Sequence, residues 1–105
     1  MKIEIPEQKK VISTYGPKAQ TVIHCEECAE LIQAISKMHR IRLAEADDKD
    51  AYYNLVEEMA DVLIIIAQLK EIYGISDSEI QKLVDFKCAR QEARINESAR
   101  GISAG

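Results

Sequence analysis

The segment Glu57–Leu69 reads EEMADVLIIIAQL, and its apolar centre leaves no polar face for water. The helical pattern around this segment runs from about Ala51 to Tyr73, and Gly74 is placed to end the helix. A helix that is apolar all round must be buried on every side. A chain of 105 residues with about three helices cannot cover it alone. The segment therefore predicts a helical oligomer with this helix at the subunit interface.

A second amphipathic helix is predicted upstream, from Lys18 to about His39, after the Gly16-Pro17 pair. Its apolar residues recur at helical spacing: Val22, Cys25, Cys28, Ala29, Ile32 and Ile35, with Ile23, Leu31 and Met38 widening the stripe. The charged residues 40–50 lack a sustained apolar pattern. We expect them to form the connection between the two helices, partly helical or mobile.

A third helix is predicted to begin at a capping box over residues 76–79, with Ser76 as the N-cap and Glu79 at the third helical position. We expect this helix to reach about residue 98. Three of its apolar residues are expected to face inward: Leu83, Phe86 and Ile95.

These elements predict an all-α fold, a helical hairpin plus a third helix, which assembles into a four-helix-bundle-type oligomer. Two prolines, four glycines and 5% aromatic residues agree with helices rather than strands. We expect one domain over residues 1–105, with an N-terminal arm at 1–15, a helical core at 16–98 and a frayed tail at 99–105. The arm is weakly patterned, so a short strand, a helical turn and a flexible arm all stay open.

The charge pattern narrows the class of function. A net charge of −4 argues against a nucleic-acid binder. Residues 26–61 hold ten acids and four bases, whereas residues 82–105 hold five bases and three acids. An acidic centre and a basic end suit a site that binds both a cation and a polyanion.

Membrane and redox functions are not favoured by the sequence. The longest apolar run, Val62 to Ala67, is six residues, too short to span a membrane. Three cysteines in a chain without a signal peptide predict reduced thiols in the cytoplasm. Cys25 and Cys28 have no second cysteine pair beside them, so we favour small packed side chains over zinc binding or redox chemistry.

Two similar acidic segments precede apolar runs, and each places two carboxylates on one helix face. Glu27 and Glu30 form one pair, and Glu58 and Asp61 form the other, each three residues apart. No lysine or arginine stands three or four residues from these acids, and carboxylates that enter an apolar environment need partners. A hard divalent cation is the natural partner of an all-oxygen cluster.

The register of the two pairs supports a shared metal site. Their midpoint falls at residue 44, within the expected connection, so an antiparallel hairpin would bring both pairs to the same height. A di-iron site would need Glu-x-x-His helices, but neither His24 nor His39 lies three residues after a candidate glutamate. The sequence therefore predicts Mg²⁺, with Mn²⁺ as a substitute, and solvated surface charge is the alternative.

The two motifs resemble those of the MazG-like all-α nucleotide pyrophosphatases, whose signature is ExxE, a spacer and then ExxD. Glu27-x-x-Glu30 and Glu58-x-x-Asp61 match it with 27 residues between them, and the segments EECAELIQAI and NLVEEMADVLIIIAQL resemble that family's motif helices. The resemblance covers about residues 16–94. It implies a Mg²⁺ enzyme of nucleotide-pool house-cleaning, usually dimeric or tetrameric, that cleaves a nucleoside triphosphate to the monophosphate and pyrophosphate.

The resemblance also implies roles for individual residues. All four acids would hold the metal, and Glu27 or Glu30 would accept a proton from the attacking water. The phosphates need cations, and one stripe of the third predicted helix offers Lys87, Arg90 and Arg94. Candidate contacts to the base and sugar are Asn54, Gln20 and His24.

The sequence leaves the substrate open among dUTP, dCTP, general nucleoside triphosphates and phosphoribosyl-ATP. Two other functions also stay open. One is a non-catalytic helical interaction or regulatory module, and the other is a metal-binding helical bundle without nucleotide chemistry.

Overall fold

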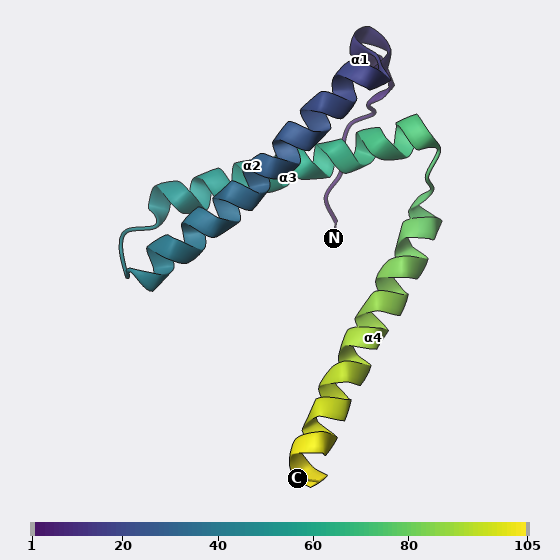
Figure 1. Ribbon diagram of the computed structural model, residues 1–105. Helices are drawn as coiled ribbons and strands as arrows, with labels where there is room; N and C mark the ends of the chain where they lie inside the picture. The colour runs from purple at the N-terminus through teal and green to yellow at the C-terminus, as the bar shows by residue number, and fades with distance from the viewer. Residues whose placement is uncertain (1, 105) are drawn as a thin grey trace. The chain divides into compact units, whose positions relative to one another are not determined.

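The computed structural model describes the backbone of residues 2–104 and the side chains of residues 2–101. Its helices are α1 (Lys9–Tyr15), α2 (Pro17–Leu43), α3 (Lys49–Tyr73) and α4 (Asp77–Ala104), and no strand occurs among the described residues (Figure 1). The predicted all-α fold is confirmed. The chain divides into two compact units, Met1–Gly74 with α1 to α3 and Ile75–Gly105 with α4.

The N-terminal arm contains a short helix, α1, after an irregular segment. The Glu7 carboxylate accepts a hydrogen bond from the Lys9 N–H at 2.7 Å and caps the start of α1. Gly16 then adopts φ +85°, in the left-handed region that glycine enters without steric cost, and ends α1. Pro17 follows at once as the first residue of α2, a position where its missing N–H costs nothing.

The predicted connection over residues 40–50 is too long. Helix α2 continues to Leu43 and α3 begins at Lys49. The Arg42 Nε lies 2.5 Å from the Asp48 Oδ2, and the Asp47 Oδ1 accepts a hydrogen bond from the Lys49 N–H at 3.0 Å. The charged residues of this stretch therefore extend and cap the helices, and the turn itself is short.

The predicted boundaries around residues 74–79 are confirmed. Gly74 ends α3 at φ +66°, and the Ser76 N–H and Oγ donate to the Glu79 Oε2 at 2.8 and 3.1 Å. The Glu79 N–H donates back to the Ser76 Oγ at 3.1 Å, which completes the capping box. Helix α4 extends past the expected end near residue 98 to Ala104, and Gly105 lies outside the described residues.

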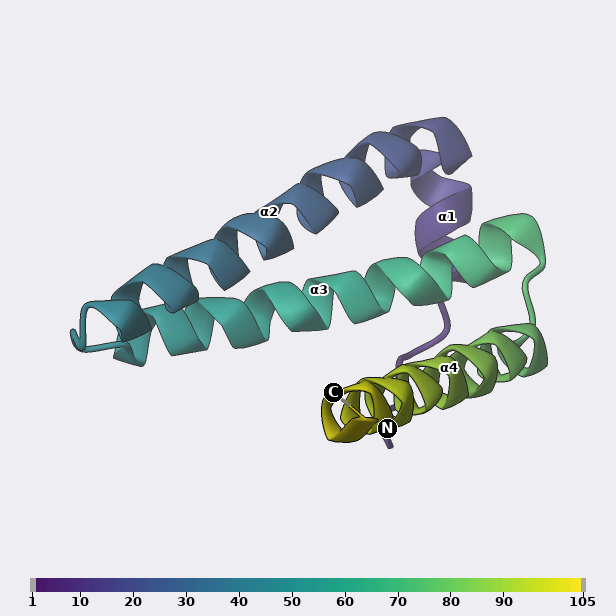
Figure 2. The same cartoon turned by 60° about the horizontal axis from the view of Figure 1, so that its bottom comes forward.

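Helices α2 and α3 pack side by side as an antiparallel hairpin, and α1 contacts both (Figure 2). The α2 residues that are buried or half-buried follow one another at steps of four and three, which is the period of a helix packing seam. They are Gln20, His24, Glu27, Leu31, Ala34, Met38 and Ile41. The N-terminal half of this seam is polar, so the hairpin buries little apolar surface along it.

The apolar stripe predicted to be the packed face of α2 instead lies on its exposed side. The six residues that define it are exposed: Val22, Cys25, Cys28, Ala29, Ile32 and Ile35. Ile23 is exposed as well, whereas Leu31 and Met38, which widen the stripe, are half-buried in the seam. The same holds for α3, where Val56, Met59, Ile64 and Ile66 are exposed beside the buried Ile65. The side chains expected to face inward from α4, Leu83, Phe86 and Ile95, are exposed as well. The single chain therefore leaves apolar faces of its helices uncovered.

Candidate metal centre

The structure brings together three of the four predicted metal ligands in the α2–α3 seam. One carboxylate oxygen each of Glu27, Glu58 and Asp61 lies within 4.8 Å of the other two. Glu27 occupies a seam position of α2, while Glu58 and Asp61 are one turn apart on α3. The antiparallel register places them at the same height, as the residue counts predicted.

Glu30 completes the acidic cluster from its edge. Its side chain is exposed, and it is not among the three acids whose oxygens converge. It lies close enough to Glu58 for its charge to raise the pKa of that carboxyl, and it does the same to Glu27. Glu30 therefore belongs to the same electrostatic site while keeping access to solvent.

The crowding of these acids raises their pKa values. Desolvation, followed by the charges of Glu30 and Asp61, raises the pKa of Glu27 from its ordinary 4.5 to about 7. Desolvation and the charges of Glu30 and Asp61 also raise the pKa of Glu58. Every influence on these two pKa values acts in the same direction, so no nearby cation offsets the repulsion.

Two buried carboxylate oxygens indicate which kind of ligand the site would bind. The Oε2 atoms of Glu27 and Glu58 are buried and have no hydrogen-bond partner among the described residues. A buried carboxylate oxygen without a partner is unfavourable, and a proton or a cation removes that cost. The residues therefore fit a hard divalent cation, whose preferred ligands are carboxylate oxygens.

Two of the predicted base and sugar contacts, Gln20 and His24, are buried in the seam. The His24 Nε2 is 2.8 Å from the Oε1 of Gln68, whose Nε2 donates to the Oε1 of Gln8 at 3.0 Å. Sequence reasoning missed Gln68 and Gln8, which lie 44 and 16 residues from His24. No local spacing signals such a contact, because it depends on how α1, α2 and α3 pack.

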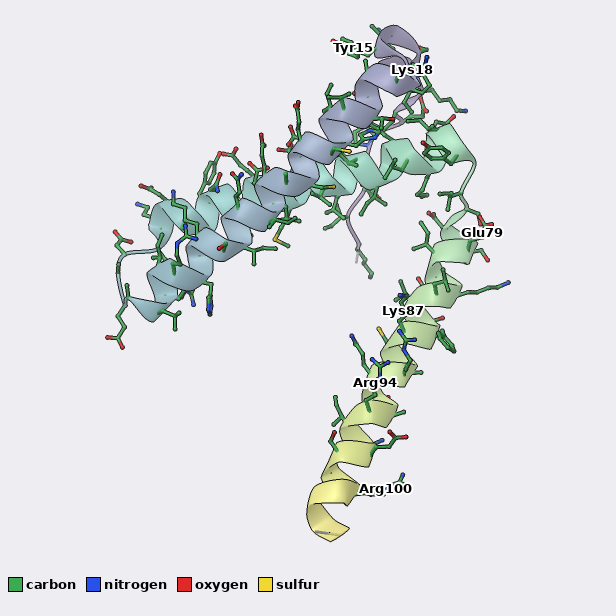
Figure 3. The ribbon with its side chains drawn as sticks, viewed as in Figure 1. Tyr15, Lys18, Glu79, Lys87, Arg94 and Arg100 are labelled. Carbon is green, nitrogen blue, oxygen red and sulfur yellow. The ribbon has the colours of Figure 1, made fainter. Side chains whose placement is uncertain are left out.

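The other predicted contacts belong to two different units of the chain. Asn54 is half-buried on α3, one turn before Glu58. Lys87 and Arg94 project from α4 (Figure 3). Arg90 lies with its guanidinium carbon 5.7 Å from the centroid of the Phe86 ring, as in a cation–π contact. Contacts of these four residues with a substrate stay predictions.

The cysteines are all free and exposed, so the expectation that Cys25 and Cys28 are small packed side chains is wrong for the single chain. Across the described residues, no helix is long and apolar enough to cross a membrane.

Comparison with known proteins agrees with the geometry of the site. The family model for the MazG nucleotide pyrophosphohydrolase domain matches residues 16–94, which include both acid pairs. An uncharacterized protein, YvdC of Bacillus subtilis (strain 168), is 29% identical over 89 residues, covering 80% of this chain and 83% of the relative. No solved structure matches. Because the matched domain spans most of the chain and contains the carboxylate cluster, the protein belongs to the MazG nucleotide pyrophosphohydrolase family.

Proposed function

We propose that this protein hydrolyses a nucleoside triphosphate to the monophosphate and pyrophosphate with the help of Mg²⁺, which Mn²⁺ can replace. The observation that carries the proposal is the convergence of Glu27, Glu58 and Asp61 within 4.8 Å, with buried oxygens that lack partners. Glu30 adds a fourth carboxylate at the exposed edge. This site and the family of the domain together support the proposal.

The residues of the chain divide the work in the proposed reaction. A bound Mg²⁺ would neutralise negative charge on the phosphates, and carboxylate oxygens of the site would coordinate it. Glu27 or Glu30 accepts the proton of the attacking water. Glu58 and Asp61 hold the cation from α3. Phosphoryl transfer needs positioning and charge stabilisation more than covalent chemistry.

The remaining predicted contacts complete the proposal. The cations of α4 would contact the phosphates: Lys87, Arg90 and Arg94. Asn54 and Gln20 would contact the base or sugar, and His24 would line the same site one turn before Glu27. In the described part of α4 each of these cations is exposed and available to a ligand.

Assembly into a homodimer or homotetramer is part of the same proposal. An apolar cavity of about 540 Å³ runs along α3, lined by Leu31, Val56, Met59 and Leu63 together with Ile5 of the N-terminal segment. Its lining includes exposed apolar residues of α3, Val56, Met59 and Ile64, and the polar half of the seam cannot supply the missing burial. A second copy of the chain would cover these faces, as a helix with no polar face requires.

Pyrophosphate release tests the function directly. The protein is incubated with Mg²⁺ and each of a panel of ribonucleoside and deoxyribonucleoside triphosphates and phosphoribosyl-ATP. We expect turnover of at least one nucleotide and its loss in Glu58→Gln, with helical circular dichroism unchanged. Glu57→Gln, an exposed neighbour on the same turn, is the matched control and should keep activity.

The alternatives give other outcomes in the same assay. A regulatory module would neither bind Mg²⁺ nor release pyrophosphate, and a metal-binding bundle would bind Mg²⁺ without turnover. Either result with a folded sample would sink the proposed function.

A further inference from the structure

A relay of hydrogen bonds crosses the Met1–Gly74 unit and ends at His24. The Gln8 Nε2 donates to the Pro6 carbonyl oxygen at 2.8 Å, and the Gln68 Nε2 donates to the Gln8 Oε1 at 3.0 Å. The Gln68 Oε1 lies 2.8 Å from the His24 Nε2. Both ends of the last bond are buried, since Gln68 is 7% and His24 5% exposed. The relay therefore joins the N-terminal segment to α3 and α2.

The direction of every bond in the relay follows from its first member. A backbone carbonyl can only accept, so the Gln8 amide must turn its NH₂ group to Pro6 and its oxygen to Gln68. Gln68 must then present its NH₂ group to Gln8 and its oxygen to His24. Because that oxygen can only accept, the His24 Nε2 must carry the hydrogen. The relay thus selects the Nε2–H tautomer of a neutral imidazole.

With the hydrogen on Nε2, the other ring nitrogen of His24, Nδ1, is unprotonated and can only accept a hydrogen bond. The His24 Nδ1 is buried and has no hydrogen-bond partner among the described residues. His24 lies one helical turn before Glu27 on the seam face, whereas Gln68 lies two turns beyond Asp61 along α3. The hydrogen bond of the His24 Nε2 is therefore made on the side away from the carboxylates, and Nδ1 is the ring nitrogen that has no bond of its own.

Two unsatisfied acceptors, the His24 Nδ1 and the Glu27 Oε2, then stand one turn apart on the same helix face. In the states that the proposed step needs, an ionised Glu27 and a neutral His24, neither can satisfy the other, because both only accept. A water has two donors and satisfies both while its own lone pairs stay free. We propose that His24 is a positioning residue of the proposed hydrolysis, and that its Nδ1 and the Glu27 Oε2 orient the attacking water between them.

This inference rests on the proposed function, and its step balances. The water oxygen forms a bond to a phosphorus of the α–β anhydride as the bridging P–O bond breaks. The proton of the water passes to the Glu27 carboxylate, and pyrophosphate leaves with the bonding electrons. His24 accepts a hydrogen bond throughout and keeps its own proton on Nε2.

The tautomer is tested first, without any reference to activity. Long-range ¹H–¹⁵N correlation spectra of the full-length protein with labelled histidine distinguish a protonated ring nitrogen from a bare one. At pH 8 we expect His24 to show Nε2–H and a bare Nδ1, and Gln8→Ala to weaken this preference. The chain's other histidine, the exposed His39, is the internal control and should not respond to Gln8→Ala. A protonated Nδ1 in the wild type, or unchanged His24 signals in Gln8→Ala, would overturn the relay.

Two amide substitutions then separate positioning of water from packing. Asparagine places an acceptor where the His24 Nδ1 stands but cannot reach Gln68, whereas glutamine reaches Gln68 with a donor but lacks the Nδ1 acceptor. We expect His24→Asn to keep kcat within about threefold, and His24→Gln to lose about tenfold or more in kcat with little change in KM. A merely structural His24 would reverse this order, and that result would overturn the positioning role.

The outcomes for the two proposals are distinguishable. If no nucleotide is hydrolysed, the proposed function falls and the positioning role falls with it, while the spectra still decide whether the relay fixes the tautomer. If hydrolysis occurs but His24→Gln keeps the full kcat, only the positioning role is refuted. If His24→Gln does not fold, His24→Asn decides the positioning role: a kcat within about threefold of the wild type supports it, and a loss of about tenfold or more refutes it.

Discussion

Without a metal, this protein should lose stability as the pH rises from 5 to 8. Glu27 has a pKa of about 7 in the folded chain and about 4.5 ordinarily, so the folded state binds more protons between these values. The free energy of unfolding is therefore greatest below pH 4.5 and decreases until the pH passes about 7. The full difference corresponds to about 3 kcal/mol if none of it is screened. Because Glu27 is only half-buried, we expect about 1–2 kcal/mol.

Urea unfolding followed by far-ultraviolet circular dichroism measures this loss, at one protein concentration, with a chelator at pH 5 and pH 8. Glu27→Gln should flatten the dependence, and Glu26→Gln, which changes an exposed neighbour, should leave it intact. Mg²⁺ at pH 8 should restore stability, by about 2.7 kcal/mol at a hundred times its Kd. Metal-free stability that rises or stays level from pH 5 to 8 would refute the reasoning, and so would a wild-type slope in Glu27→Gln.

Other parts of the chain give independent predictions. Asp61→Asn should weaken Mg²⁺ binding at least about tenfold in titration calorimetry, because it removes a converging oxygen and its charge. Glu45→Gly should stabilise the turn by about 1 kcal/mol, because Glu45 has φ +53°, and Glu45→Ala should give no such gain in urea unfolding. Ser76→Ala should lower the stability of the first turn of α4 by about 1 kcal/mol, as measured by amide hydrogen exchange. The Ser76 hydrogen bonds lower the pKa of Glu79, so the cap should be strong above the ordinary glutamate pKa and weaken as the pH falls through the lowered one; Glu79→Gln should abolish that dependence. Ile66→Glu should shift the protein to a smaller assembly in analytical ultracentrifugation, and Gln33→Glu should not.

The features that sequence reasoning predicted correctly are local or follow from counting. A capping box needs only residues 76–79, and the cap at Gly74 needs a single residue type at a helix end. The shared height of the two acid pairs needs only the assumption of a hairpin and the midpoint of their numbers. The helical periodicity therefore predicted the three long helices, and the counted register predicted that Glu27 and Asp61 lie close together.

The features that it missed depend on packing between distant segments. Apolar periodicity pointed to the stripe containing Val22 and Ile32 as the buried face of α2, because it treats polar residues as exposed. The seam instead buries Gln20 and His24, which are stabilised by partners that no spacing rule connects to them. Residues 40–43 continue α2, because Arg40 and Arg42 are good helix formers on a solvent face and Ile41 extends the seam by one more step.

The composition of the seam links the candidate site to assembly. A two-helix seam gains stability from apolar residues at its repeating positions, yet Glu27, Glu58 and Asp61 meet there and repel one another. Leucine at those positions would strengthen the hairpin and remove the site, which is the usual conflict between stability and function. The burial that the seam lacks must then come from the outer faces of α2 and α3, where Ile32 and Ile66 are exposed in the single chain. We expect a second copy of the chain to bury those faces, so the acids that meet between α2 and α3 themselves favour the proposed oligomer.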